Sequence, residues 1–241
     1  MRKPRAVARW CSNDAPGHFG LIMRPAIHVT TMFDRQTTAL IRPAIDALAR
    51  VFVRAGVSAN ALTFTGLVVG WLAAAAIGLQ MSLTGAALIL VSRLFDGLDG
   101  AVARQTSPTD RGGFLDISLD FLFYPAIPLA FAFADPPRNA LAAALLLAAF
   151  VGTGTSFLAF AVIAAKRGLT SAAYPNKSFY FLGGLTEATE TLAFFVAMCL
   201  WPQHFATLAF VFAAMCAVTI ATRIHWGWQA FRPHADPGTE S

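Results

Sequence analysis

Four aspartates lie close together in a chain that is otherwise strongly apolar: Asp96, Asp99, Asp116 and Asp120. The stretch that precedes them, Gly56 to Ser92, contains no Asp, Glu, Lys or Arg. Within each pair the spacing is three or four residues, so in a helix each pair shares one face. A short connection between two antiparallel helices would bring all four carboxylates toward one point, where they need compensation for their mutual repulsion.

Three kinds of compensation are open: protonation in a proton relay, pairing with Arg93, Arg104 and Arg111, or binding of divalent cations. Divalent cations prefer oxygen ligands, and a double pair of aspartates is typical of a two-metal site for displacement at phosphorus. The neighbouring residues favour this chemistry, because Gly100 and Ala103 are too small to block a ligand from the helix face. Arg104 also offers a fork of donors that suits phosphate.

The elements that position these aspartates are expected to be membrane helices. The chain is 56% apolar and only 13% charged, with a mean hydropathy of +0.59, whereas ordinary soluble domains are about 25% charged. Apolar stretches of about 20 residues match the length of a bilayer span, and helices satisfy their own backbone polar groups in lipid. We therefore predict an all-α integral membrane protein with six transmembrane helices. The predicted spans are 59–79, 82–103, 113–134, 140–165, 184–201 and 205–223.

Basic residues predict the orientation, because cytoplasmic loops are enriched in Lys and Arg. One side of the predicted bundle has only Arg138. We expect the other side to be cytoplasmic, with both termini and the aspartates on it. The net charge of +5 then reflects topology and lipid headgroups and predicts no nucleic-acid partner. The basic residues on that side are Arg35, Arg42, Arg50, Arg54, Arg93, Arg104, Arg111, Lys166, Arg167, Lys177, Arg223 and Arg232.

The rest of the chain is expected to have three parts around the membrane domain, which spans 57–232. Residues 1–31 are polar, basic and rich in Pro and Gly, and we predict a disordered extension. Apolar residues at helical spacing over 32–56 predict an interfacial amphipathic helix on the cytoplasmic surface, with a helix packed against the bundle as the alternative. Residues 233–241 are expected to form a loose tail. The cysteines, at positions 11, 199 and 216, fit no metal motif and are expected to be small apolar fillers.

The aspartate segment resembles the signature of the CDP-alcohol phosphotransferase family. That signature is an Asp-x-x-Asp-Gly-x-x-Ala-Arg block followed by Gly-x-x-x-Asp-x-x-x-Asp. The chain has one residue fewer than the family usually has between Arg104 and Gly112, which affects only the loop. The stretch SANALTFTG is similar to another family element and keeps Asn60 and Thr63, with Ala59 in place of Pro. The matching signature residues are Asp96, Asp99, Gly100, Ala103, Arg104, Gly112, Asp116 and Asp120.

The resemblance implies a transferase of phospholipid synthesis in the inner cell membrane. It would move a phosphatidyl group from a CDP-activated lipid, most commonly CDP-diacylglycerol, to a small alcohol and release CMP. Asp96, Asp99 and Asp116 would ligate two Mg²⁺ or Mn²⁺ ions, and Asp120 would serve as the general base beside them and as a possible further ligand. The family often forms homodimers. The nucleotide and phosphate pocket would be lined by Gly100, Ala103, Arg104, Gly112, Asn60 and Thr63.

The acceptor site is less clear from the sequence. Lys166 and Arg167 end the fourth predicted span and could grip an acceptor phosphate, or could be anchors that reach the membrane surface. Glu187 and Glu190 open the fifth span and could bind acceptor hydroxyls or an amine, or could pair with nearby bases.

Two other functions are compatible with an aspartate cluster in a membrane protein. A proton- or ion-coupled transporter would use the carboxylates as a relay, but it predicts polar groups at mid-membrane, whereas these lie near one boundary. A prenyl-diphosphate enzyme also binds metals through aspartates, but it lacks the Gly-x-x-Ala-Arg continuation.

Overall fold

The computed structural model describes residues 31–167 and 185–232, and within these ranges the chain is helical with no strand. This confirms the all-α prediction. The predictions for 1–30 and 233–241 lie outside the described residues. The helices are α1 (Thr31–Arg54), α2 (Ala59–Gly78), α3 (Ser82–Gln105), α4 (Asp110–Ala134), α5 (Pro136–Lys166), α6 (Ala188–Leu200), the 3₁₀ helix η1 (Pro202–His204) and α7 (Phe205–Ala230).

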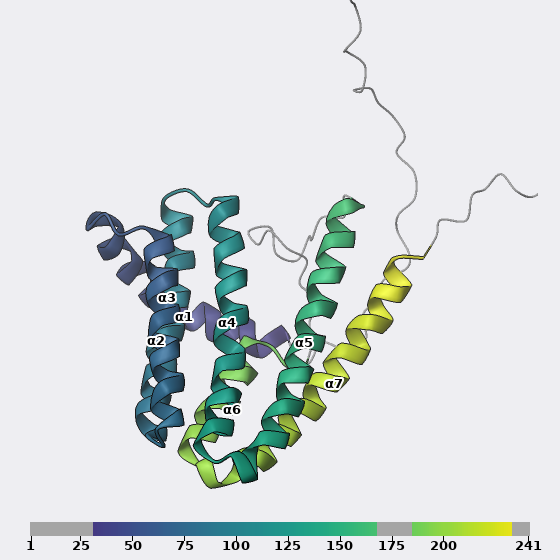
Figure 1. Cartoon of the computed structure of the whole chain (residues 1–241). Helices are drawn as coiled ribbons and strands as arrows, with labels where there is room; N and C mark the ends of the chain where they lie inside the picture. The colour runs from purple at the N-terminus through teal and green to yellow at the C-terminus, as the bar shows by residue number, and fades with distance from the viewer. Residues whose placement is uncertain (1–30, 168–184, 233–241) are drawn as a thin grey trace, which may run out of the picture.

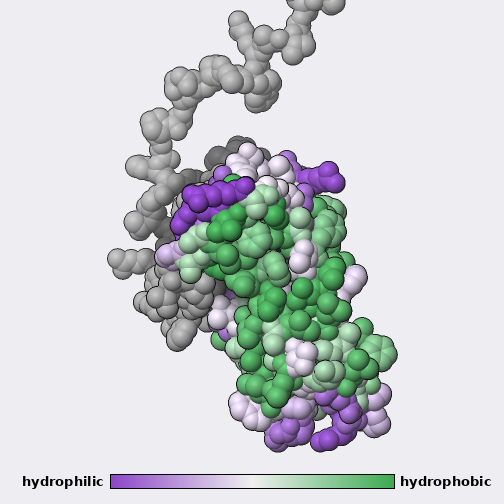
Figure 2. Space-filling model, turned by 90° about the vertical axis from the view of Figure 1, so that its left-hand side faces the viewer, coloured by the Kyte–Doolittle hydropathy of each residue, from purple (hydrophilic) through white to green (hydrophobic). Residues whose placement is uncertain are grey.

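Four helices in the described part of the chain are long and apolar enough to cross a membrane: α2, α4, α5, and α7 together with η1. Figure 2 shows a broad hydrophobic band on one face of the molecule, with hydrophilic residues gathered at both ends. The chain is therefore a multi-pass membrane protein. α3 has the length of a span, but Arg93, Asp96 and Asp99 interrupt its apolar sequence.

α6 is shorter than the predicted span over 184–201. It has 13 residues, about 20 Å at 1.5 Å per residue, against a hydrocarbon core of about 30 Å. Its start is set by the backbone N–H of Glu187, which donates to the Glu190 carboxylate at 3.0 Å in a capping arrangement. Its end is set at Leu200, because Trp201 leaves helical geometry and Pro202 opens η1.

Consecutive helices run in opposite directions, so their ends gather at two opposite ends of the bundle (Figure 1). The α3–α4 connection and the C-terminal ends of α5 and α7 lie at the top of the figure, and the α2–α3 and α4–α5 turns lie at the bottom. α2 packs against α3 and α4, α4 packs against α5, and α5 packs against α7. The upper end therefore carries Arg104, Arg111, Lys166 and Arg167, whereas Arg138 lies at the lower end, as predicted for these five residues.

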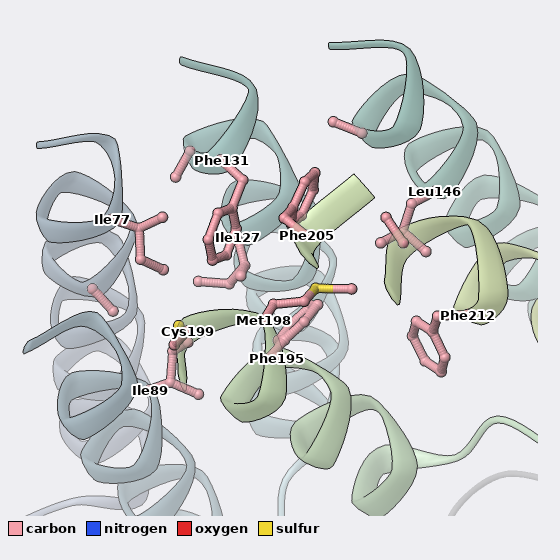
Figure 3. Close-up of a cluster of buried hydrophobic side chains, with 14 of the residues drawn as sticks. Ile77, Ile89, Ile127, Phe131, Leu146, Phe195, Met198, Cys199, Phe205 and Phe212 are labelled. Carbon is pink, nitrogen blue, oxygen red and sulfur yellow. The ribbon is translucent and has the colours of Figure 1, made fainter. Parts of the chain in front are cut away.

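α6 contributes large side chains to the centre of the bundle despite its length. Phe195 and Met198 are fully buried, and Cys199 is 1% exposed. Figure 3 shows Cys199 beside Ile89 of α3, and Met198 near Ile127 of α4. Side-chain packing is a main source of helix association in lipid, so these contacts hold α6 in place. Cys199 and the buried Cys216 are free thiols in the core, as expected for apolar fillers.

α1 packs against α3. Of the two arrangements predicted for this segment, this is the helix packed against the bundle. Its Ile45, Ala49 and Phe52 contact a buried cluster that contains Leu98 and Val102 of α3. Figure 1 shows α1 running across the upright helices. Gly56, which has a φ of +72°, then turns the chain into α2 in a conformation that glycine adopts at low cost.

Candidate active site

The ends of α3 and α4 bring three of the four aspartates together. Thr109 caps α4 by accepting the backbone N–H of Gly112 at 3.0 Å, so α4 begins at Asp110. Asp116 and Asp120 then face the last turns of α3. Each of Asp96, Asp116 and Asp120 offers a carboxylate oxygen, and these oxygens all lie within 4.8 Å of one another.

Asp99 lies beside this group. The sequence predicted that all four carboxylates would meet at one point, whereas the structure brings three of them together. Asp99 is only 5% exposed, and it interacts with the Thr63 side chain of α2. Its Oδ2 atom is buried without a hydrogen-bond partner. Burial of an unpaired carboxylate oxygen is costly, so this atom marks a position where a bound group is expected.

A pocket opens where the three carboxylates meet and is formed by α2, α3 and α4. Thr63, Gly66 and Leu67 of α2 form one wall, which places the predicted Thr63 beside the aspartates. The other lining residues are Arg93, Asp96, Asp116, Leu119 and Asp120. The site therefore combines charged groups from α3 and α4 with a wall from α2 that has no charged side chain.

Arg93 lines the pocket, and the sequence named it as one of three possible partners of the aspartates but not as a binding residue. Its Nη1 atom lies 2.8 Å from Oδ1 of Asp120 and 3.4 Å from Oδ1 of Asp96. Its guanidinium carbon lies 3.8 Å from the centre of the Phe123 ring. The available signal was the spacing from Arg93 to Asp96, three residues on one helix, which allows but does not require an ion pair.

The other predicted nucleotide-binding residues surround the same end of the bundle. Gly112 lies near Asn60, because a Cβ added at Gly112 would be 3.5 Å from the Asn60 side-chain oxygen. A Cβ added at Gly100 would be 3.3 Å from Arg104 Nη1, so the small residue leaves room for that guanidinium. Arg104 lies 3.9 Å from Asp46 of α1 and is 45% exposed. Ala103 is half-buried on the same helix.

Arg167 and Glu190, two of the predicted acceptor residues, have structural partners. Arg167 donates to the carbonyl of Phe231 at 3.0 Å and so caps the end of α7. Lys166 is exposed at the end of α5. Glu190 accepts from the Glu187 backbone at the start of α6. These contacts account for Arg167 and Glu190 without a ligand and leave their binding roles as predictions.

A second polar cluster lies between α5, the start of α6, and α7. Arg223 donates to the carbonyl of Thr153 at 3.0 Å and interacts electrostatically with Glu187. Thr186 donates through its hydroxyl to the Thr219 hydroxyl at 3.0 Å, and Glu187 is 8% exposed. Of the bases that could pair with the predicted acceptor glutamates, Arg223 is the one that interacts electrostatically with Glu187 among the residues that the structure describes.

The residues of the first site fit a hard divalent cation. All of the donors are carboxylate oxygens, which suit Mg²⁺ and Mn²⁺ better than softer metals. The orphaned Oδ2 of Asp99 adds a buried acceptor that otherwise has no compensation. We conclude that the aspartates of α3 and α4 can hold divalent metal and that Arg93 lies against them.

Gly70 supports this arrangement from α2, which yields a testable prediction. A Cβ at position 70 would lie 2.8 Å from Cε2 of Phe123 and 3.0 Å from Ser92 Oγ. Phe123 is 1% exposed and packs against Arg93 and Phe195, so Gly70→Ala is expected to cost about 1–3 kcal/mol of stability. Thermal unfolding in detergent would measure this loss.

Gly78→Ala is the matched control, because a Cβ there would meet only the Ala130 carbonyl at 3.9 Å. It lies on the same helix and gains the same methyl group. Equal melting temperatures for the two variants would contradict the tight contact at Gly70.

Comparisons with known proteins show the family of the chain. A family model described as CDP-alcohol phosphatidyltransferase matches residues 56–224. Inner membrane protein YnjF of Escherichia coli (strain K12) is 49% identical over 197 residues, covering 82% of this chain and 96% of that protein. Archaetidylinositol phosphate synthase of Methanothermobacter thermautotrophicus is 43% identical over 88 residues, covering 36% of this chain and 44% of that protein.

Solved structures share the fold. Phosphatidylinositol phosphate synthase (PgsA1) of Mycobacterium tuberculosis with CDP-DAG bound has a TM-score of 0.64 at 21% identity, covering 80% of this chain and 98% of that one. The same enzyme in complex with manganese and citrate has a TM-score of 0.63 at 22% identity, covering 79% and 93%. The family match confirms the resemblance found in the aspartate signature and identifies a phosphotransferase of phospholipid biosynthesis. The chain belongs to the CDP-alcohol phosphatidyltransferase family.

Proposed function

We propose that this protein transfers a phosphatidyl group from CDP-diacylglycerol to a small alcohol and releases CMP. The observation that carries the proposal is the convergence of Asp96, Asp116 and Asp120 in one pocket at the ends of α3 and α4. CDP-DAG is bound in a solved structure of the same fold, which supports this donor. The family match favours transfer over the alternative of a proton- or ion-coupled transporter.

The aspartates have separate roles in this proposal. Asp96, Asp99 and Asp116 hold two Mg²⁺ or Mn²⁺ ions, with Asp120 as the base beside them. When bound, such ions neutralise the diphosphate and the leaving CMP. Arg104, with Gly100 and Ala103 on the same helix, binds the nucleotide part of the donor, and Asn60, Thr63 and Gly112 complete that end of the site.

The transfer step follows from the position of Asp120. The acceptor hydroxyl oxygen forms a bond to the β-phosphorus of the donor, and its proton passes to the Asp120 carboxylate. The bond between that phosphorus and the oxygen that bridges to CMP breaks, and CMP leaves with the electron pair. Asp120 is suited to this role because its carboxylate lines the pocket beside Asp96 and Asp116.

We place the acceptor alcohol toward the polar cluster of α5, α6 and α7. Arg223 and Glu187 offer one positive and one negative group there, and both are held by neighbouring helices. Lys166 is exposed at the same end of α5 and has room to contact an acceptor phosphate. Arg167 and Glu190 contribute indirectly, by holding the ends of α7 and α6.

The membrane arrangement that goes with this function has six crossings and a cytoplasmic active site. α3 completes a crossing because its charged end faces the pocket, and α6 completes one together with the chain on either side of it. α1 then lies at the cytoplasmic surface, both termini are cytoplasmic, and the enzyme forms a homodimer in the inner membrane. The clustering of basic residues at the aspartate end supports the orientation.

Measurement of CMP release tests the proposal directly. Purified protein would receive CDP-diacylglycerol, Mn²⁺ or Mg²⁺, and a panel of alcohols with and without a phosphate group. We expect CMP release with one class of alcohol, complete loss of turnover on chelation, and recovery when either ion is restored. The lipid product would be identified by mass spectrometry.

Two outcomes would count against the proposal, and they are distinguishable. Full turnover in excess chelator would remove the metal role but leave the transfer reaction. Absence of CMP release with every acceptor, in protein shown to be folded, would remove CDP-diacylglycerol as the donor.

A further inference from the structure

Arg93 lies against the carboxylates of Asp96 and Asp120, where a positive charge offsets their mutual repulsion. Its Nη1 atom contacts one oxygen of Asp120 at 2.8 Å and one of Asp96 at 3.4 Å. Those two carboxylates belong to the group whose oxygens lie within 4.8 Å of one another. Arg104, the arginine of the signature, lies 3.9 Å from Asp46 of α1. Arg93 is not part of the signature, yet it is the arginine that the fold places against these carboxylates.

The arginine is held there by contacts that do not involve the aspartates. Its guanidinium stacks on Phe123, at 3.8 Å from the ring centre, and lies 5.5 Å from the Tyr124 ring. Its Nη2 atom lies 3.4 Å from Ser92 Oγ, and that hydroxyl donates to the Gly66 carbonyl at 2.7 Å. Its side chain is only 13% exposed. A guanidinium supported in this way keeps its place when the carboxylates acquire other partners.

We propose that Arg93 is an internal counter-cation that competes with divalent metal for the Asp96 and Asp120 carboxylates. In the metal-free protein it balances part of the carboxylate charge and keeps the pocket intact. When metal binds, Arg93 gives up its share of those oxygens and remains stacked on Phe123. The wild-type protein therefore binds metal more weakly than the same carboxylates would without the arginine.

The competition follows from the atoms involved. Asp96 and Asp120 each direct Oδ1 toward the same Arg93 nitrogen. A divalent ion held at these carboxylates would be close to the unit positive charge of Arg93, and the two would repel each other. A residue that only oriented the carboxylates would have the opposite effect, because its loss would weaken metal binding.

The inference rests on the metal site of the proposed function, and Mn²⁺ binding to the purified full-length protein without donor tests it. Arg93→Met keeps an unbranched side chain over Phe123 but removes the charge. We expect about tenfold tighter Mn²⁺ binding, because an adjacent unit charge repels the ion strongly at the effective dielectric of a protein surface. We also expect a lower melting temperature in chelator and a larger rise when Mn²⁺ is added.

Three further variants make the result specific. Arg93→Lys keeps the charge and should bind Mn²⁺ much as the wild type does. Arg93→Gln keeps a hydrogen-bond donor without the charge, and should tighten binding even if the methionine variant fails to fold. Arg138→Met removes an exposed arginine that pairs with Asp135 at the other end of the bundle, and should leave Mn²⁺ affinity unchanged.

Each outcome decides the inference. If Arg93→Met and Arg93→Gln can be purified as folded protein only in the presence of Mn²⁺, the inference is supported, because the ion then replaces the missing charge. Unchanged or weaker binding in a folded neutral variant overturns it and leaves the wild-type metal site standing. If neither neutral variant can be purified as folded protein even with Mn²⁺, the inference is also overturned, because the ion then does not replace the arginine. Absence of Mn²⁺ binding in wild type and variants alike would overturn the metal site itself.

Discussion

Replacement of Asp120 by asparagine is expected to slow turnover by about 10² to 10⁴-fold, the usual cost of losing a general base. Asparagine keeps the size of the side chain and one oxygen that can accept from Arg93, which lies 2.8 Å from Asp120 in the structure. It cannot take the acceptor proton. Binding of Mn²⁺ and of the CDP donor should survive, because Asp96, Asp99 and Asp116 remain.

Calorimetric titration of Mn²⁺ and of CDP-diacylglycerol, beside the CMP-release assay, would separate the two effects. If Asp120→Asn loses metal and donor binding together with turnover, Asp120 is a ligand more than a base. Its carboxylate lies among the same group of oxygens as Asp96 and Asp116, so that result would be structurally consistent. The base would then be sought at Glu187, which is buried beside the second polar cluster.

Asp96→Asn is expected to weaken Mn²⁺ binding by at least about 100-fold, beyond the 10- to 100-fold that is typical for groups that only support a ligand. Asp96 belongs to the converging group, and Asp99 next to it has a buried oxygen without a hydrogen-bond partner. Donor binding should fall with the metal, because the diphosphate would lose its counter-charge. The same titrations would measure both losses.

Asp135→Asn provides the matched control for this prediction. Asp135 caps α5 at the other end of the bundle, where it accepts from the Arg138 backbone, and asparagine caps helices equally well. This variant should bind Mn²⁺ like the wild type. Comparable losses in the two variants would point to a general effect of charge on the protein and against ligation by Asp96.

Much of the site could be predicted from the sequence, because it depends on spacing within helices. Asp96 and Asp99 lie on one helix and Asp116 and Asp120 on the next, and a short connection forces the two helix ends together. Spacing gives only the face of a helix, however, and not the rotation of one helix against another. The structure groups Asp96 with Asp116 and Asp120 and leaves Asp99 beside Thr63, a difference that arises from how α2 packs.

The sequence offered Arg93 as one of three possible partners of the aspartates, but it could not predict which of the three would pair with Asp96 and Asp120. The position of Arg93 depends on the Phe123 ring, on Ser92 and on the close approach that Gly70 allows between α2 and α4. Apart from the contact with the neighbouring Ser92, these contacts join residues that are distant in sequence, and no single helix pattern contains them. Apolar residues in a membrane chain look alike from the sequence whether they face lipid or support a charged group.

The fold was predicted most accurately where short turns separate long apolar stretches. The bounds of α2 and α3 agree with the prediction to within about two residues, which is the usual uncertainty of helix ends. α6 differs because hydropathy does not register the capping contact between Glu187 and Glu190. α1 has an apolar face at helical spacing that fits either a membrane surface or a neighbouring helix. Its contact with α3 depends on tertiary packing, which the spacing of apolar residues does not encode.

The carboxylate pocket is lined entirely by α2, α3 and α4, which are consecutive in the chain. Every residue that lines this pocket therefore precedes α5 in the chain. The second polar cluster depends on α5, α6 and α7, which follow later. Under the proposed function, substitutions in the later helices can therefore change the choice of acceptor without altering any residue that lines the carboxylate pocket.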